Sequence, residues 1–301
     1  MKQHDLELNE LYTSYKSYLI SIAYQMLGSL VDAEDIVHDT FVRLQINGNS
    51  QVDITSIKSY ISKMVINRCI NEVKSSRKKR ETYVGTWLPE PIVHGSQIEP
   101  SEQVVQNEQL YYAFVVLMER LSTAERVVYV LREALHLKHS EIADMLHITE
   151  PNCRKMFGRA KKKMTVLPNE TDMSYQTQQS QVTTFISALS RGDIQGISDI
   201  LTSDVILVAD GGGKVVTAIN QIASRKRVLV LLHAIATKFF SGKKALAVRV
   251  NNQPGILVTK NDEAIGIFSF AWNQNTNKIE RIFYIVNPDK LKHIIVCTSH
   301  E

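Results

Sequence analysis

Hydrophobic positions recur every three or four residues through the first part of the chain. From residue 7 to about residue 76 this spacing runs without a proline, since the first proline is Pro89, and it is typical of amphipathic helices. Residues 84–100 interrupt the pattern with prolines, a glycine and serines, and helical spacing resumes over residues 102–164. The pattern predicts two all-helical modules joined by a linker.

The last part of the chain has a different pattern. After a polar segment at 168–177, helices are predicted at 178–191 and 194–201, followed by alternating or apolar strands at 205–209, 245–250, 255–259, 264–272 and 279–285. This order predicts a separate α+β domain. The expected modules are residues 1–83, a linker at 84–107, residues 108–167, a linker at 168–177, and residues 178–301.

Composition narrows the class of protein. With 301 residues, 44% hydrophobic and 22% charged, the chain is expected to be globular with more than one domain. No apolar run approaches the roughly 20 residues of a membrane span, and the N-terminus does not resemble a secretory signal. Cys69, Cys153 and Cys297 have no metal-type spacing. A cytoplasmic protein without membrane contact, disulfides, metal or cofactor is predicted.

The net charge of +4 hides strong local asymmetry. Residues 54–80 hold eight basic groups and one acidic group, and residues 154–168 hold six basic groups and no acidic group. Acidic segments precede both blocks. Such basic blocks are typical of nucleic-acid contact, although solvated helix ends give the same charge pattern.

An acidic stripe is predicted on the helix at residues 31–45. Its apolar residues fall on one face of a helical wheel, and its acidic residues with His38 fall on the other. The apolar face consists of Ala33, Ile36, Val37, Thr40, Phe41 and Leu44, and the polar face of Asp32, Asp35, His38 and Asp39.

The predicted helix at residues 56–80 combines an apolar face with a face of lysines and amides. The apolar face is Ile57, Ile61, Met64, Val65, Cys69 and Val73, and the polar face is Lys63, Asn67, Asn71, Lys74 and Lys78. Lysine neutralises phosphate and asparagine can hydrogen-bond base edges, so this helix suits DNA. The basic run at residues 77–80 extends the phosphate-binding surface.

Residues 141–164 predict a helix-turn-helix. A short amphipathic helix at 141–146 leads through a tight connection at 147–149 to a basic helix that tolerates Pro151 in its first turn. The second helix is expected to bury Cys153, Met156, Phe157, Ala160 and Met164. It is expected to expose Arg154, Lys155, Gly158, Arg159 and Lys162 toward a DNA major groove.

In this order and spacing, the three segments resemble the extracytoplasmic-function (ECF) sigma factors over residues 6–165. The resemblance implies that Asp35, His38 and Asp39 contact the β′ clamp helices of core RNA polymerase, with the β flap as a further contact. Promoter DNA is the other implied partner. The loop at 46–55 would lie near a flipped base. The implied minus-10 residues are Tyr60, Lys63, Asn67, Arg68, Asn71, Lys74 and Lys78, and the implied minus-35 residues are Arg154, Lys155, Gly158, Arg159 and Lys162.

Three further motifs are similar to signatures of the ECF subgroup with a fused SnoaL-like domain, an α+β cone of the nuclear transport factor 2 type. They are WLPEP at 87–91, DGGGK at 210–214 and NPDKL at 287–291. The fold class implied is therefore two all-α sigma domains followed by that α+β domain, which would modulate sigma activity through intramolecular contact. The residues assigned to this contact are Trp87, Pro89, Asp210, Gly211, Gly212, Gly213, Lys214, Asn287, Pro288, Asp289 and Lys290.

Two other functions remain alternatives at the level of sequence. One is a DNA-binding regulator that senses a ligand through the C-terminal domain, and the other is an enzyme with a DNA-binding appendage. Asp210, His233 and Tyr284 are the candidate acid–base residues, but they lack recognisable paired spacing. The acidic stripe favours a sigma factor, since an ordinary regulator needs no polymerase-docking face, and a non-enzymatic function is predicted.

Overall fold

The structure is a computed structural model that describes residues 2–46, 57–93, 112–133, 136–164, 174–239, 242–273 and 275–294. The chain divides into two compact units. The first comprises residues 1–81, 100–110 and 115–166, and the second comprises residues 82–99, 111–114 and 167–301.

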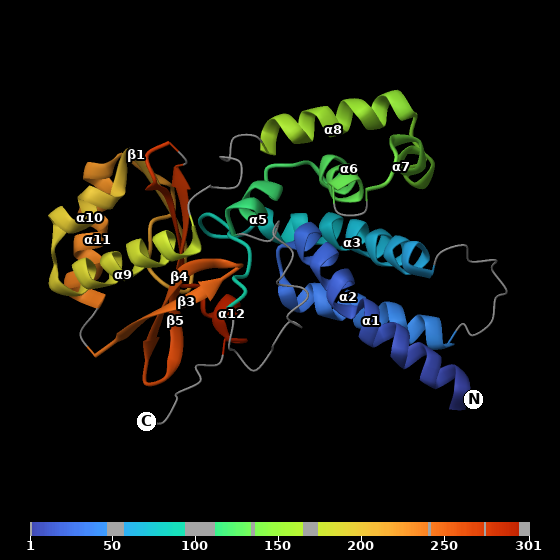
Figure 1. Ribbon diagram of the computed structural model, residues 1–301, viewed down its shortest axis with the longest axis horizontal. Coiled ribbons are helices and arrows are strands. Elements are labelled where there is room, and N and C mark those ends of the chain that lie inside the picture. The colour runs from blue at the N-terminus through green and yellow to red at the C-terminus, as the bar shows by residue number, and fades with distance from the viewer. Residues whose placement is uncertain are drawn as a thin grey trace. The chain divides into compact units, whose positions relative to one another are not determined.

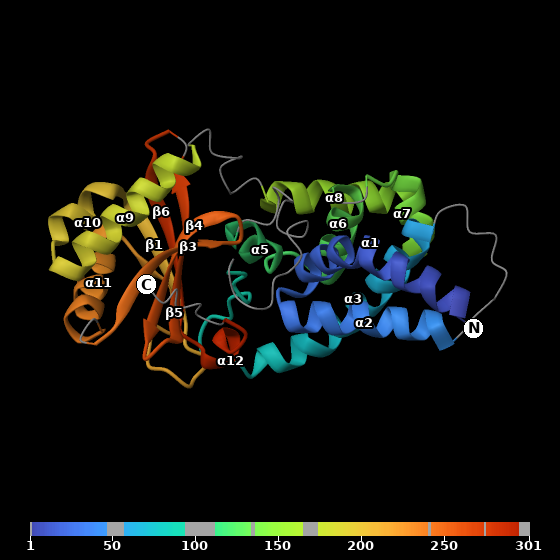
Figure 2. The same cartoon turned by 60° about the horizontal axis from the view of Figure 1, so that its bottom comes forward.

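The described part of the first unit is helical (Figures 1 and 2). Its helices are α1 (Lys2–Leu27), α2 (Leu30–Ile46), α3 (Ile57–Glu81), most of α5 (Tyr112–Met118), α6 (Thr123–Glu133), α7 (His139–Leu146) and α8 (Glu150–Met164). Helices α1, α2 and α3 pack against one another, and α6 contacts α1, α3 and α8. Gly28 ends α1 with a φ of +68°, a conformation that glycine adopts without strain. Within the described residues, helices are present where the sequence pattern predicted them.

The second unit is built on a six-stranded mixed sheet with the order β2-β1-β6-β5-β4-β3. The strands are β1 (Leu201–Asp210), β2 (Ile222–Ala223), β3 (Lys244–Val250), β4 (Gln253–Lys260), β5 (Glu263–Asn273) and β6 (Lys278–Ile285). β1 runs parallel to β6, and the remaining pairs are antiparallel. Asn251–Asn252 and Asn261–Asp262 have positive φ, as type I′ turns between neighbouring strands require.

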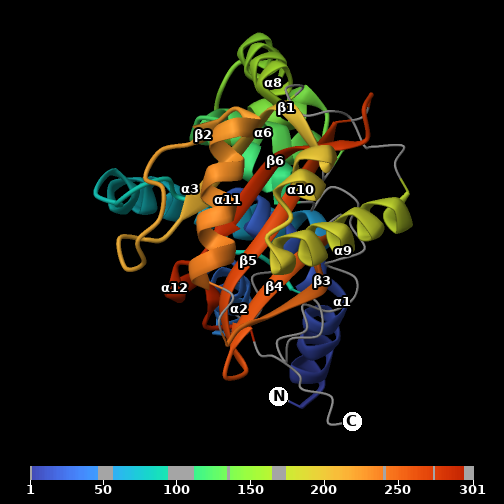
Figure 3. The ribbon, with the colours of Figure 1, turned by 90° about the vertical axis from the view of Figure 1, so that its left-hand side faces the viewer.

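Helices α9 (Tyr175–Arg191), α10 (Ile194–Ile200) and α11 (Arg225–Phe239) cover one face of this sheet (Figure 3). Phe185 of α9 packs edge-on against Phe270 of β5 at a centroid distance of 5.3 Å. Ser174 caps α9 by accepting a hydrogen bond from the backbone N–H of Thr177. The five predicted strands and both predicted helices of the α+β domain are confirmed, and so is the fold class.

The opposite face of the sheet is contacted by the segment at residues 82–93, which the sequence predicted to begin a linker. Leu88, Ile92 and Val93 are buried, and Val93 forms an isolated bridge with Val250 at the edge strand β3. Tyr112 adds a ring contact to Phe283 at 5.5 Å and donates a hydrogen bond of 2.7 Å to the carbonyl oxygen of Pro89. This segment is therefore a packed part of the second unit.

Three elements were missed in the sequence pattern: helix α11, strand β2 and the four-residue helix α12 (Pro288–Leu291). Helix α11 buries Val228, Leu232 and Ile235, which is a helical spacing, but the apolar run at 228–232 obscured it. Strand β2 has two residues, too few for any periodicity. Among the described residues, no helix is long and apolar enough to cross a membrane.

Candidate functional site

The predicted acidic stripe lies on the exposed face of α2. Ala33, Val37 and Thr40 are buried, whereas Asp35, His38 and Asp39 are exposed. Ile36 and Phe41 complete the buried face, and Leu44 is half-buried. The predicted division of this helix into two faces is confirmed, because burial of one face fixes which side chains remain in solvent.

Asp39 is joined to the neighbouring helix by an ion pair. Nη2 of Arg68 on α3 donates a hydrogen bond of 2.6 Å to Oδ2 of Asp39. The Arg68 side chain is 22% exposed and the Asp39 side chain is 61% exposed. Arg68 was expected beside Asn67 on the DNA-facing part of α3, but the structure turns its guanidinium toward α2.

The exposed face of α3 carries the predicted lysines and amides. Lys63, Asn67, Asn71 and Lys74 are exposed, and Tyr60 is half-buried. Ile61, Val65, Cys69 and Val73 form the buried face, with Met64 half-buried. The Lys78 side chain, the basic run at 77–80 and residues 47–55 of the predicted loop lie outside the described side chains.

Helices α7 and α8 form the predicted helix-turn-helix. His147 adopts a left-handed conformation after α7, and the N–H of Ile148 donates to the carbonyl of Ala143 at 3.0 Å. Ala143 is buried as the close helix contact requires. On α8, Cys153, Ala160 and Met164 are buried as predicted. Met156 and Phe157 are half-buried, which corrects the prediction, because Phe157 lies beside the ring of Tyr129 at the margin of the contact with α6.

The five candidate DNA-contacting residues of α8 are all exposed, but they differ in their contacts. Arg154 pairs with Glu150 one turn earlier at 2.6 Å. Arg159 lies 3.4 Å from Glu125 of α6. Gly158 has open space where a Cβ atom would stand. Lys155 and Lys162 complete the exposed set.

Glu125, which the sequence did not single out, anchors α8 to α6. Its carboxylate accepts hydrogen bonds from Lys163 at 2.6 Å and from the backbone N–H of Ser122 at 3.0 Å. Burial acts to raise the pKa of Glu125, but these hydrogen bonds outweigh it and leave the pKa below its usual value. The Ser-x-x-Glu pattern of a capping box at 122–125 could have indicated this residue.

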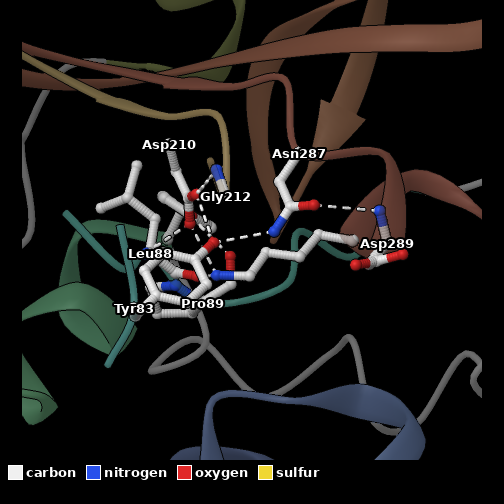
Figure 4. A network of polar contacts seen from close by, with 9 residues as sticks. Tyr83, Leu88, Pro89, Asp210, Gly212, Asn287 and Asp289 are labelled. Atoms are coloured by element: carbon white, nitrogen blue, oxygen red, sulfur yellow. Dashed lines mark hydrogen bonds and ion pairs between the residues drawn. The ribbon is translucent and has the colours of Figure 1, made fainter. Parts of the chain in front are cut away.

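The WLPEP, DGGGK and NPDKL motifs meet in one polar network, here called the Asp210 network (Figure 4). Its members are Tyr83, Leu88, Asp210, Gly212, Asn287 and Lys290. The Asp210 side chain is fully buried and accepts hydrogen bonds from Tyr83 Oη at 2.5 Å, Leu88 N at 2.8 Å and Gly212 N at 3.0 Å. Lys290 Nζ donates to Asp210 Oδ2 at 2.6 Å and to the carbonyl of Leu88.

Aromatic rings enclose the lysine of this network. Lys290 Nζ lies 4.1 Å from the ring centroid of Trp87 and 5.1 Å from that of Tyr83, within the range of cation–π attraction. Burial first, and then the hydrogen bond to Asp210, raise the pKa of Tyr83. The Tyr83 hydroxyl therefore keeps its proton and donates a hydrogen bond to the carboxylate. Asn287 Nδ2 donates a hydrogen bond to the oxygen of the same hydroxyl at 2.7 Å. Tyr83 stands just before the WLPEP motif and was not predicted.

Backbone geometry explains the triple glycine. A Cβ atom on Gly211 would lie 2.2 Å from the carbonyl oxygen of Val215, and one on Gly212 would lie 2.4 Å from Nδ2 of Asn287. Gly212 and Gly213 also have positive φ. Lys214 and Asp289 form an exposed ion pair of 2.5 Å outside the buried part of the network, and Pro288 begins the short helix α12 (Pro288–Leu291) after the Asn287 cap.

The three candidate acid–base residues do not share a site. Ala209 is paired with Tyr284 across β1 and β6, and both belong to the core that faces the helices. Asp210 follows Ala209 and therefore points to the opposite face of the sheet, while His233 is exposed on α11. No acid–base pair is formed by these three residues.

Comparison with protein families identifies the two helical modules. Residues 11–79 match the model of sigma-70 region 2, and residues 112–164 match the model of sigma-70 region 4. Helices α1–α3 therefore carry the first match, and α5–α8 carry the second.

Relatives and a solved structure extend the likeness to nearly the whole chain. The ECF RNA polymerase sigma factor SigJ of Mycobacterium tuberculosis is 27% identical, with 95% of this chain and 93% of SigJ covered. The probable ECF RNA polymerase sigma factor SigI of the same organism is 28% identical, with 97% of each chain covered. The crystal structure of SigJ superposes with a TM-score of 0.76 at 24% identity, covering 95% of this chain and 99% of that one, so the fold is shared.

Proposed function

We propose which surface of this chain binds each partner, starting from the family of the chain. The chain belongs to the extracytoplasmic-function sigma factors that carry a fused SnoaL-like C-terminal domain. It is a sigma factor that acts with RNA polymerase core at promoter DNA. The sigma-70 matches and the two near full-length relatives favour this function over a ligand-sensing regulator or an enzyme with a DNA-binding appendage.

The acidic stripe of α2 docks on the β′ clamp helices of core polymerase in this proposal. The observation that carries the assignment is the exposure of Asp35, His38 and Asp39 on a helix whose opposite face is buried. Carboxylates on an exposed face attract a basic partner surface and set its orientation. Contact of the second helical module with the β flap is the corresponding proposal for α6–α8.

Promoter DNA is bound by α3 and α8. The exposed lysines and amides of α3, with Tyr60 at its first turns and Lys78 near its end, bind the minus-10 element. Arg154, Lys155, Gly158, Arg159 and Lys162 of α8 bind the minus-35 element. Basic side chains at exposed positions of both helices support this assignment, because they can neutralise phosphates while the helix faces a groove.

The variant Asp39→Lys tests the docking assignment. Reversing a charge in the stripe should weaken binding of the full chain to core polymerase by about tenfold or more, measured by titrating labelled chain with core. Its circular dichroism spectrum should stay unchanged, because Asp39 is exposed. Unchanged affinity of Asp39→Lys for core would contradict the assignment of α2 as the docking helix.

The C-terminal domain modulates initiation through the Asp210 network. Support comes from the way this network fixes residues 82–93, the segment between the two sigma domains, against the α+β domain. A holoenzyme formed with Lys290→Met should therefore yield a different amount of specific transcript at equal core occupancy. Equal output from wild type and variant would argue against modulation by this contact.

A further inference from the structure

The ion pair between Asp39 and Arg68 joins two surfaces that the proposed function assigns to different partners. Asp39 lies in the acidic stripe of α2, and Arg68 lies on α3, the helix assigned to the minus-10 element. The contact is a single hydrogen bond in which Nη2 of Arg68 donates to Oδ2 of Asp39 at 2.6 Å. The Arg68 side chain therefore points toward α2, whereas its neighbour Asn67 is exposed on α3.

Burial separates Arg68 from the DNA-facing positions of α3. Asn67 and Asn71 are exposed, whereas the Arg68 side chain is 22% exposed. Nη1 of Arg68 is shielded from solvent and has no hydrogen-bond partner among the described residues. A guanidinium that contacts phosphate needs its nitrogens open on the DNA side, so this geometry does not suit a primary DNA contact.

Asp39 keeps room for a second partner. Its side chain is 61% exposed, and a carboxylate offers about four lone-pair sites on two oxygens. The contact from Arg68 uses Oδ2, so Arg68 itself leaves Oδ1 open. Arg68 therefore holds the carboxylate without covering it.

We infer that Arg68 is a positioning residue for polymerase docking: it fixes the Asp39 carboxylate in the orientation in which a basic side chain of core polymerase binds it. This inference rests on the proposed docking role of α2. Fixing a side chain before binding removes part of its ordering cost, which amounts to about 0.5–1.5 kcal/mol per immobilised side chain. The corresponding change in affinity is about twofold to tenfold.

The test measures the affinity of the full chain for core polymerase with five variants. Arg68→Met, which keeps much of the side-chain length without the charge, should bind core about twofold to tenfold more weakly. Arg68→Lys should recover part of the loss, because an ammonium can also donate to Oδ2. The double variant Arg68→Met/Asp39→Asn should bind no more weakly than Asp39→Asn alone. Arg43→Met is the matched control, since Arg43 is an exposed arginine four positions after Asp39 on α2.

Promoter binding by the assembled holoenzyme supplies an independent readout. If Arg68 positions Asp39, the salt dependence of promoter binding is the same for wild type and Arg68→Met. If Arg68 contacts a phosphate, the slope of log affinity against log salt becomes shallower by about one, and core affinity is unchanged; that result overturns the inference. Tighter core binding by Arg68→Met also overturns it, because the ion pair would then mask Asp39.

Failure of the inference and failure of the proposed function give different results. If Asp39→Asn binds core weakly but Arg68→Met binds normally, α2 docks on polymerase and only the positioning role is wrong. If neither variant changes core affinity, the docking role of Asp39 is wrong and the inference falls with it. An equal loss in the Arg43→Met control would show a general charge effect and would also overturn the inference.

Discussion

At the scale of single residues, Asp210 and Lys290 form a buried ion pair. Both side chains are buried, with exposures of 0% and 7%, and lie 2.6 Å apart. The Asp210 carboxylate accepts hydrogen bonds from Tyr83, Leu88, Gly212 and Lys290, so its charge is compensated. Removal of one partner would leave the other charge buried without its counter-ion, which is costly in proteins.

Lys290→Met should therefore lower the free energy of unfolding of the second unit by about 3 kcal/mol or more. Urea denaturation, followed through the fluorescence of Trp87 and Trp272, measures this loss. The control is Lys292→Met, because Lys292 is 73% exposed and pairs with the exposed Asp289. Such a surface pair contributes at most about 1 kcal/mol, and an equal loss in both variants would contradict the role of Lys290.

The sequence identified several residues of this network but did not predict how they are arranged in space. The resemblance pointed to Asp210, Asn287 and Lys290, and the structure shows that all three lie in one cluster. Tyr83 was missed because a single tyrosine next to a proline-rich segment has no periodic or spacing signal. Its hydrogen bond to Asp210 spans 127 positions of the chain, and a contact of that range depends on tertiary packing.

The burial of a helix agrees with its predicted wheel where one face of the helix is buried and the other is in solvent. The wheel of α2 separates Asp35 and Asp39 from Val37 and Thr40, and burial in the structure follows the same division. In α8 the same approach placed Phe157 too deep, because periodicity identifies a face but not its margins. Arg68 is a comparable case: its position on α3 was known, but its direction was set by Asp39 on another helix.

Helix α8, which we propose binds the minus-35 element, can be tested through Arg154. Arg154 is 67% exposed and lies in the first turns of α8, tethered to Glu150. Arg154→Ala should relax base preference in the minus-35 element by about 1–3 kcal/mol at the contacted position, measured by sequencing the DNA bound from a randomised pool. Core affinity should be unchanged, and a loss of core binding in this variant would contradict the assignment.

For the whole molecule, the net charge of +4 is a balance between acidic and basic surfaces. The acidic face of α2 and the basic faces of α3 and α8 belong to the first unit, and residues 82–93 belong to the second. The sequence predicted three modules, because turn-forming residues interrupt the helical and strand patterns, whereas the structure divides into two compact units. The resemblance assigned Trp87 and Pro89 to an intramolecular contact, but it did not predict that Leu88, Ile92 and Val93 are buried, because burial in a linker follows no regular spacing.

Transcription by a reconstituted holoenzyme tests the central claim most directly. The full chain is added to core RNA polymerase and a DNA pool with randomised upstream sequence, and the 5′ ends of the RNA products are sequenced. We predict transcripts that depend on the chain, start at a fixed distance from two selected elements, and disappear with Asp39→Lys. Absence of chain-dependent transcripts, together with absence of co-elution with core, would contradict the account of this chain as a sigma factor.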